Sequence, residues 1–162
     1  MGIFSSLFKS IEPITITLDG RNSIVVSNKK EAEFYGVGML KIAHDCANLV
    51  NTTKNPTVFF ERYNLLIEKM ENLSKLEKFH CFSGTLPSMD LKKILDKKFF
   101  TINEFIDRYY QDTLNKIDKL KTQKAKDKKI QQFYDELCKY NEYMLHENIT
   151  NYTMLHKELI NR

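Results

Sequence analysis

Histidine and cysteine are the residues of this chain best suited to metal binding or nucleophilic catalysis. They are His44, Cys46, His80, Cys81, Cys138, His146 and His156. His44 and Cys46 stand two residues apart, and on a helix this spacing points them about 200° from each other. The pair His146-Glu147 lacks the second histidine, four residues from the first, that a zinc-protease helix requires. We therefore expect no metal site.

Catalysis by a nucleophile finds equally little support in the residue spacing. Cys81 lies beside His80, but adjacent residues seldom orient each other productively. The chain contains no G-x-S-x-G elbow, no G-x-G-x-x-G motif and no phosphate loop. We expect no catalytic residues and no cofactor, and we predict that the protein is not an enzyme.

The stretch NTTKNPTVFFERY, residues 51–63, changes abruptly from small polar to bulky apolar residues. Asn55 before Pro56 matches an N-cap followed by the first position of a helix, which we expect to run to about Phe79. The helix start and the nearby Lys54 could also hold an anion. Capping is the preferred interpretation, and Thr53, Lys54 and Asn55 form a weaker candidate anion site.

Lysines crowd residues 116–129, where the apolar pattern is interrupted. Seven lysines stand against Asp118 and Asp127, so the local charge is 7 − 2 = +5. The candidate interaction surface consists of Lys119, Lys121, Lys124, Lys126, Lys128 and Lys129. Such a cluster could neutralise nucleic-acid phosphates, but a solvated tip is the preferred interpretation. The pattern leaves open whether the segment is a turn or the middle of one long helix.

A β-hairpin followed by helices is the architecture that should carry these residues. Ile14–Leu18 and Ser23–Val26 alternate as strands, and the Asp19-Gly20 step between them suits a tight turn. Asn28 and Glu31 then indicate a capping box variant. The face predicted to turn inward on the helix that follows is Ala32, Tyr35, Met39, Ile42, Cys46 and Leu49. Gly36 and Gly38 lie inside this helix, where we expect a neighbouring backbone to approach them closely.

The second half of the chain repeats the helical pattern. After the break at Ser83–Pro87, a short helix is predicted over Ser88–Lys98. Thr101 and Glu104 form a capping box that opens a further helix. Its outer face carries the i,i+4 pairs Glu104–Arg108, Arg108–Asp112 and Asp112–Lys116, which is typical of a solvated surface. Two more helices are expected, the first with Ile130, Phe133, Tyr134, Leu137, Tyr140 and Met144 and the last with Ile149, Tyr152, Leu155 and Leu159.

Length and composition indicate a single mainly α domain over residues 1–162. The chain is 42% apolar and 28% charged, with five glycines and three prolines. We expect an N-terminal segment and β-hairpin (1–28) packed on an up-and-down helical bundle (29–162), partly coiled-coil-like. Helical content should reach about 60% or more, against about 30–35% in an average domain. The odd number of cysteines favours a reducing cytoplasm, and no apolar run reaches the ~20 residues that span a bilayer.

The segments NTTKNPTVFFERYNLLIEK and KLKTQKAKDKK resemble parts of a recurrent small helical module found in bacterial and mobile-element proteins. The resemblance covers residues 45–160 and leaves out the hairpin. It implies a bacterial or phage origin. No function is attached to the module, so the resemblance implies no catalytic or binding residues.

Three functions remain, in order of preference. The first is a non-catalytic protein-interaction module, in the narrower form a regulator or inhibitor carried by a mobile element, with a protein partner and self-association as an option. The second is a nucleic-acid binder that uses the lysine-rich segment 116–129. The third is a peripheral membrane protein that uses residues 2–9, because Gly2 followed by Ser6 fits a myristoylation pattern and Ile3, Phe4, Leu7 and Phe8 form a small apolar patch. Packing of residues 2–9 on the bundle is the preferred interpretation of that segment.

Overall fold

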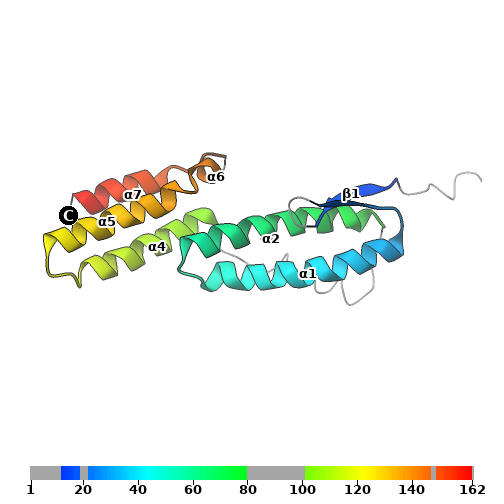
Figure 1. The fold of residues 1–162 in the computed structure, drawn as a ribbon, viewed down its shortest axis with the longest axis horizontal. Coiled ribbons are helices and arrows are strands. Elements are labelled where there is room, and N and C mark those ends of the chain that lie inside the picture. Colours follow the sequence, from blue (N-terminus) through cyan, green and yellow to red (C-terminus); the bar gives the residue numbers. More distant parts are fainter. Residues whose placement is uncertain (1–11, 19–21, 80–100, 147–148, 162) are drawn as a thin grey trace, which may run out of the picture. The chain divides into compact units, whose positions relative to one another are not determined.

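The computed structural model describes residues 12–18, 22–79, 101–146 and 149–161. Helices make up 77% of these residues. The elements are β1 (Ile14–Thr17), β2 (Ser23–Val26), α1 (Lys29–Thr52), α2 (Pro56–Leu76), the 3-10 helix η1 (Glu77–Phe79), α4 (Ile102–Ile117), α5 (Gln123–Cys138), α6 (Asn141–His146) and α7 (Asn151–Ile160) (Figure 1). The prediction of a mainly α fold with an N-terminal hairpin packed on helices is confirmed. None of the helices in these ranges is long and apolar enough to cross a membrane.

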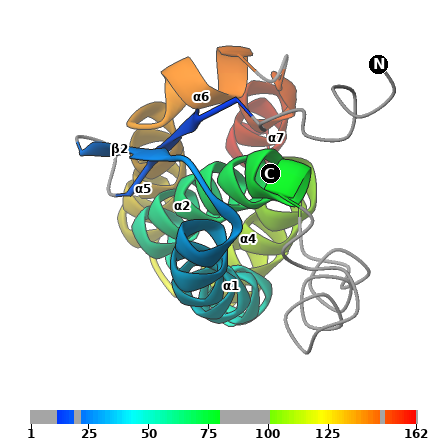
Figure 2. The ribbon, with the colours of Figure 1, turned by 90° about the vertical axis from the view of Figure 1, so that its right-hand side faces the viewer.

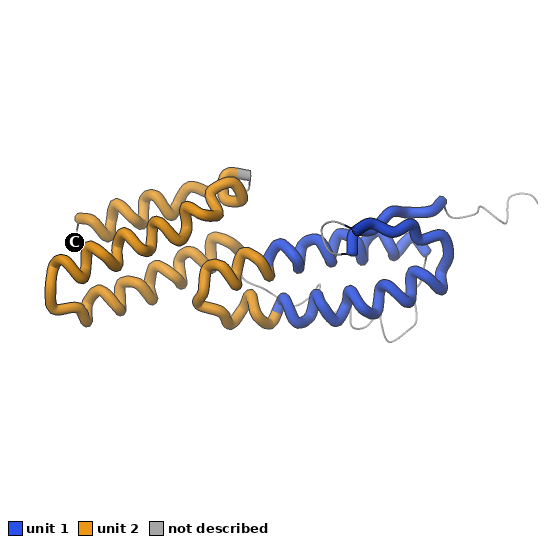
Figure 3. Tube along the Cα trace, in the orientation of Figure 1, with its two compact units in different colours: residues 1–47, 63–98 blue, residues 48–62, 99–162 orange. Residues whose placement is uncertain are grey.

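Two compact units share the chain (Figure 3). The first unit comprises residues 1–47 and 63–98, and the second comprises residues 48–62 and 99–162. The boundaries fall inside α1 and α2, so each of these two helices contributes to both units. The prediction of one domain over residues 1–162 stays a prediction.

The hairpin of the first unit is fastened to α2. The two strands pair antiparallel, with Ile16 opposite Ile24. Ile16 and Val26 turn inward and are completely buried. The side chain of Asn72 on α2 donates to the Thr17 carbonyl at 2.8 Å, and the Lys69 ammonium donates to the Leu18 carbonyl at 2.5 Å. These bonds satisfy carbonyl groups at the end of β1 that a two-stranded sheet cannot pair by itself.

Helix α1, which runs beside α2 in the first unit (Figures 1 and 2), begins where the capping pattern predicted. The Asn28 side-chain oxygen accepts the Glu31 N–H at 3.0 Å. The Glu31 carboxylate accepts from the Ser27 N–H at 2.8 Å, one residue earlier than in a standard capping box. The variant form of the box is therefore a genuine cap, because both ends of the motif satisfy backbone donors.

The inward face of α1 agrees with the predicted one only in part: Ala32, Met39 and Cys46 are buried as expected. Ile42 and Leu49 are 39% and 40% exposed, whereas Ala43, Ala47 and Val50 are completely buried. The prediction chose the larger apolar residues, but the buried face follows alanines, which let helices approach closely. The close-packing prediction is also wrong for Gly38, because a Cβ built there meets nothing within 4 Å. Gly36 is buried, and the close approach of a backbone to it stays a prediction.

The second unit is built on aromatic side chains from α2, α4 and α5. Phe59, in the first turn of α2, stacks on Phe105 of α4 with ring centroids 3.9 Å apart. Tyr109, one turn further along α4, stacks on Phe133 of α5 at 5.3 Å. Offset aromatic pairs add about 0.5–1.5 kcal/mol each to the burial of their area. This cluster fixes the first turn of α2 against α4 and α5.

The capping box of α4 is confirmed in both directions. Thr101 accepts the Glu104 N–H at 3.2 Å, and the Glu104 carboxylate accepts the Thr101 N–H at 2.9 Å. The helix ends at Ile117, and α5 begins at Gln123 behind Thr122, whose hydroxyl oxygen accepts from Ala125 N–H at 3.3 Å. The lysine-rich segment is therefore a turn followed by a new helix. The predicted helix at Ser88–Lys98 and the apolar residues 2–9 lie outside the described residues.

Candidate anion-binding pocket

A pocket of about 490 Å³ opens in the second unit, between the start of α2, the middle of α4 and one face of α5. The lining residues are Thr53, Lys54, Asn55, Pro56, Thr57, Tyr109, Lys116, Lys129, Gln132, Glu136 and Lys139. Four of them are lysines and one is an acid. The pocket therefore brings together basic side chains from three separate segments.

The α5 contribution follows from helical spacing. Lys129, Gln132, Glu136 and Lys139 are separated by three, four and three residues, so they form one stripe along α5 and its C-cap. Ile130, Phe133 and Leu137, on the adjoining face, are buried in the core of the unit. Burial of that apolar face therefore turns the polar stripe toward the pocket.

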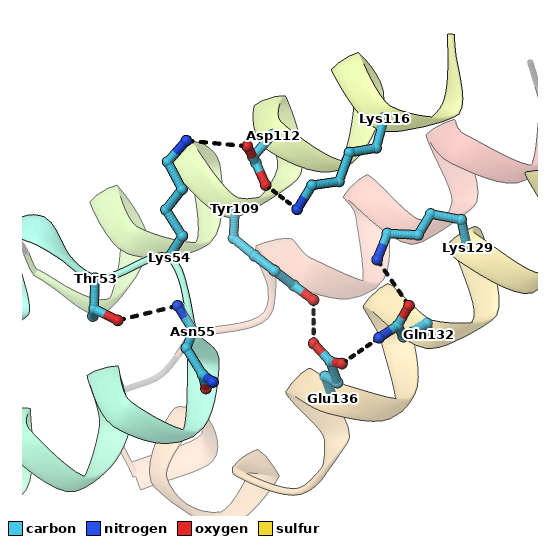
Figure 4. A network of polar contacts seen from close by, with 9 residues as sticks. All are labelled: Thr53, Lys54, Asn55, Tyr109, Asp112, Lys116, Lys129, Gln132 and Glu136. Carbon is cyan, nitrogen blue, oxygen red and sulfur yellow. Dashed lines mark hydrogen bonds and ion pairs between the residues drawn. The ribbon is translucent and has the colours of Figure 1, made fainter. Parts of the chain in front are cut away.

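Asp112 of α4 forms ion pairs with two of the four lysines (Figure 4). Its carboxylate lies 2.5 Å from the Lys116 ammonium and 3.4 Å from the Lys54 ammonium. The hydrogen bond from Lys116 is the main reason why the pKa of Asp112 falls below its ordinary value, and Lys54 adds to the effect against the opposing influence of burial. Asp112 therefore stays ionised and neutralises part of the positive charge at this rim.

A chain of hydrogen bonds crosses the pocket from α4 to α5 (Figure 4). The Tyr109 hydroxyl donates to the Glu136 carboxylate, which also accepts from the Gln132 amide at 2.6 Å. The Gln132 carbonyl in turn accepts from the Lys129 ammonium at 2.8 Å. Burial and, secondarily, the bond to Glu136 raise the pKa of Tyr109 well above its ordinary value. Tyr109 is thus a neutral donor that holds Glu136 in place.

The predicted anion-site residues Thr53, Lys54 and Asn55 all line this pocket. Asn55 is also the N-cap that the sequence predicted, since its side-chain oxygen accepts from Thr57 N–H at 2.9 Å and Val58 N–H at 3.3 Å. The hydroxyl oxygen of Thr53 accepts the Asn55 N–H at 3.1 Å. The backbone donors at the α2 start are thus already satisfied, and binding of an anion by these three residues stays a prediction.

Of the six lysines in the predicted interaction surface, Lys129 lines the pocket. Lys119 and Lys121 lie in the turn before α5, and Lys124, Lys126 and Lys128 lie on its first two turns. The prediction missed Lys139 as a pocket residue. The three-four-three spacing from Lys129 to Lys139 was the signal in the sequence that joined them, whereas the prediction for α5 followed the apolar residues on the adjoining face.

Comparison with known proteins gave no match to a family model, to a curated protein or to a solved structure. The resemblance to a bacterial helical module accordingly stays a prediction.

Arg108 has a role that the charge pattern on α4 did not reveal. Its guanidinium donates to the carbonyls of Asn51 at 2.7 Å and Thr53 at 2.6 Å, with a longer contact to Val50 at 3.4 Å. These carbonyls end α1, whose last turn carries no basic residue of its own. The sequence placed Arg108 on a solvated face, whereas in the structure its guanidinium caps another helix. Partial burial lowers the pKa of Arg108, which stays charged.

The remaining titratable residues are dispersed or involved in packing. Cys46 is buried, and His44 lies beside Asp45 at 3.9 Å on an exposed face. His156 of α7 stacks on Tyr134 of α5 with centroids 4.3 Å apart. Within residues 12–18, 22–79, 101–146 and 149–161, no group of three or more His, Cys, Asp or Glu is placed to hold a metal. His80, Cys81 and the side chain of His146 lie outside this description.

Proposed function

We propose that the protein is a non-catalytic protein-interaction module that binds its partner through the outer face of α1. The supporting observation is an apolar stripe on this face: Phe34 is 75% exposed, Val37 55% and Ile42 39%. Gly38 lies between them with open space where a side chain would be. We call these four residues the outer stripe. Phe34 lies three and four residues before Val37 and Gly38, and Ile42 lies four residues after Gly38, so the outer stripe follows one side of the helix.

The composition of the outer stripe supports this proposal. A single exposed apolar residue is ordinary, but neighbouring ones on one face mark an interaction site. Phe34 is a large aromatic side chain of the kind that anchors interfaces. Gly38 costs the helix about 1 kcal/mol relative to alanine, and no packing within the described residues offsets that cost. Close approach of a partner surface to the helix backbone at Gly38 would explain why a glycine stands at this position.

The test is an affinity capture from the native host with a matched pair of variants. Phe34→Ser combined with Val37→Ser should remove a partner that wild-type protein enriches, because both side chains would lose their apolar contact area. Met154, 64% exposed on α7, supplies the control, and Met154→Ser should leave the same partner bound. If both variants retain the same set of proteins, the outer stripe is not the interaction surface. A partner encoded by a mobile element would support the narrower proposal of a regulator or inhibitor.

A second candidate function is nucleic-acid binding by Lys119, Lys121, Lys124, Lys126, Lys128 and Lys129. It is favoured by the position of these lysines, because the first turn of α5 contains no acidic residue. Cations near a helix N-terminus oppose the helix dipole, and a phosphate backbone would relieve that conflict. Membrane association through residues 2–9 stays a prediction that no described residue favours.

A further inference from the structure

We propose that the lysine-lined pocket of the second unit binds the phosphate group of a small phosphomonoester. Four lysines, Lys54, Lys116, Lys129 and Lys139, face two carboxylates, Asp112 and Glu136, in and beside the pocket. The local charge is 4 − 2 = +2. A phosphomonoester carries about −1.5 to −2 charges at pH 7, so one such group would balance the site. This inference is independent of the outer stripe on α1.

Within the described residues, the two lysines on the α5 side of the pocket are not held by a carboxylate as Lys54 and Lys116 are. Asp112 neutralises part of the charge of Lys54 and Lys116, to which it lies at 3.4 Å and 2.5 Å. No carboxylate of the described chain pairs with Lys129 or Lys139. The Gln132 carbonyl orients the Lys129 ammonium at 2.8 Å, and Glu136 in turn accepts the Gln132 amide at 2.6 Å. Lys129 is thus positioned before a ligand arrives, which lowers the entropic cost of binding.

The start of α2 contributes the positive end of its helix dipole and the hydroxyl groups of Thr53 and Thr57 to the pocket. Its backbone N–H groups are already used. The N–H groups of Thr57 and Val58 already point to the Asn55 side chain. The Thr53 oxygen accepts from Asn55 N–H, so its own hydrogen can donate into the pocket. The positive end of the helix dipole adds attraction for an anion at this position. Binding therefore depends chiefly on the ammonium groups.

The side chains of the pocket are compatible with a phosphate group. Arginine, which clamps carboxylates and phosphates through two parallel hydrogen bonds, is absent from the lining, so the lysines would bind a phosphate as compact point charges. The Tyr109 ring is stacked between Phe105 and Phe133, so its face is not offered to a nucleic-acid base. A volume of about 490 Å³ also lies in the range of small-molecule sites, about 300–1,000 Å³.

Titration calorimetry of the full chain with glucose 6-phosphate, at low salt and pH 7.5, tests the proposal. We expect a dissociation constant tighter than about 1 mM and no binding of glucose, which lacks the phosphate. Lys129→Gln combined with Lys139→Gln should weaken binding about tenfold or more. The matched control, Lys121→Gln combined with Lys124→Gln, removes the same charge outside the pocket and should change affinity less than about twofold. Melting temperatures verify that each variant is folded, and Lys139→Gln alone replaces the first pair if that pair does not fold.

Three results would overturn the proposal. The first is the absence of glucose 6-phosphate binding under these conditions. The second is an equal loss of affinity in both lysine pairs, which would show attraction to general positive charge. The third is tight binding of a 20-nucleotide single-stranded DNA that glucose 6-phosphate does not displace, because the site would then recognise a polyanion. The Phe34→Ser, Val37→Ser variant should retain phosphate binding, so failure of this inference and failure of the proposed interaction face remain distinguishable.

Discussion

Arg108 caps the end of a helix to which it does not belong. The carbonyls that end α1 have no following turn to pair with, and α1 supplies no basic residue in its last turn. Arg108 provides both missing elements, a positive charge and several donors, from α4. The link spans 55 residues or more of sequence, and for this reason no local pattern could disclose it.

Removal of this guanidinium should lower the stability more than is usual for a residue on a partly solvated face. Arg108→Ala is expected to lower the free energy of unfolding by about 1.5–3 kcal/mol, the range for hydrogen bonds to charged groups. Urea denaturation measures the loss. Arg108→Lys should recover only part of it, because one ammonium cannot reproduce the planar fork. Arg62→Ala, an exposed arginine on α2, is the control. A loss below about 0.5 kcal/mol for Arg108→Ala would contradict this account.

His156 should make the stability depend on pH. Burial lowers the pKa of this imidazole, which stacks on Tyr134, below 6.5, and the charge of Asp135 opposes the shift without cancelling it. The folded state therefore prefers the neutral ring. As pH falls through 6.5 toward the lowered pKa, the unfolded chain takes up a proton that the folded chain refuses, so stability decreases.

Urea denaturation between pH 7.5 and 5 measures this slope. His156→Gln should flatten it, and an NMR titration of the His156 ring protons reports the folded pKa directly. A folded pKa above 6.5 would reverse the sign and refute the assignment.

The starts of α1, α2 and α4 were more predictable than the buried face of α1. Asn28, Asn55 and Thr101 cap as predicted because capping depends on only a few neighbouring residues. The face of α1 was mispredicted in part because alanine carries little hydrophobic signal, although Ala43 and Ala47 are completely buried. The pocket was predictable in part: Thr53, Lys54, Asn55 and Lys129 were recognised, whereas the structure was needed to bring α5 and α4 against the start of α2.

The cap of α2 can be tested by itself. Asn55→Ala should destabilise the protein by roughly 0.5–2 kcal/mol, because two N–H groups lose their acceptor. Asn55→Asp should retain most of the stability, since aspartate caps equally well. Thermal unfolding monitored by circular dichroism gives both values. Unchanged stability of Asn55→Ala, together with lost ligand binding, would favour the ligand-loop interpretation instead.

Replacement of the lysines at the start of α5 and in the turn before it is expected to maintain or raise the free energy of unfolding, in contrast to the changes above. Lys121, Lys124, Lys126 and Lys128 changed together to Glu should leave stability unchanged or raise it by about 0.3–1 kcal/mol. The reason is that acids near a helix N-terminus complement the dipole where the wild-type first turn has none. Urea denaturation measures this term.

The same quadruple variant separates a solvated tip from a nucleic-acid surface. We expect wild-type protein to bind duplex DNA no tighter than about 10⁻⁴–10⁻⁶ M, the non-specific range. Salt-sensitive binding well below that range, abolished by the four changes, would establish the nucleic-acid alternative. Fluorescence anisotropy with a labelled duplex at two salt concentrations provides the readout.

The two compact units share helices rather than a linker. Residues 29–47 of α1 belong to the first unit and residues 48–52 to the second, while α2 is divided in the reverse order at residues 62 and 63. A helix that loses its packing in one unit must end abruptly at the boundary, without a cap. Folding of one unit is therefore expected to stabilise the parts of α1 and α2 that belong to the other unit.

We expect the whole chain to unfold in one cooperative transition for this reason. Differential scanning calorimetry should give a ratio of calorimetric to van't Hoff enthalpy close to one. Leu73→Ala in the first unit and Phe133→Ala in the second remove completely buried side chains, and both should lower the same single transition. Two resolved peaks, each shifted by one of the variants, would mean that the units unfold independently.

The reactivity of the Lys69 amine can report whether the hairpin is attached to α2. The Lys69 side chain is 1% exposed and is committed to the Leu18 carbonyl and the Glu68 carboxylate, while lysines such as Lys54 and Lys116 extend into solvent. An amine-acylating reagent consequently meets Lys69 only in molecules whose hairpin has lifted from α2. The rate at which the peptide that carries Lys69 gains an acetyl group therefore measures the detachment of the hairpin. Mass spectrometry follows this rate in the wild-type protein, without any substitution.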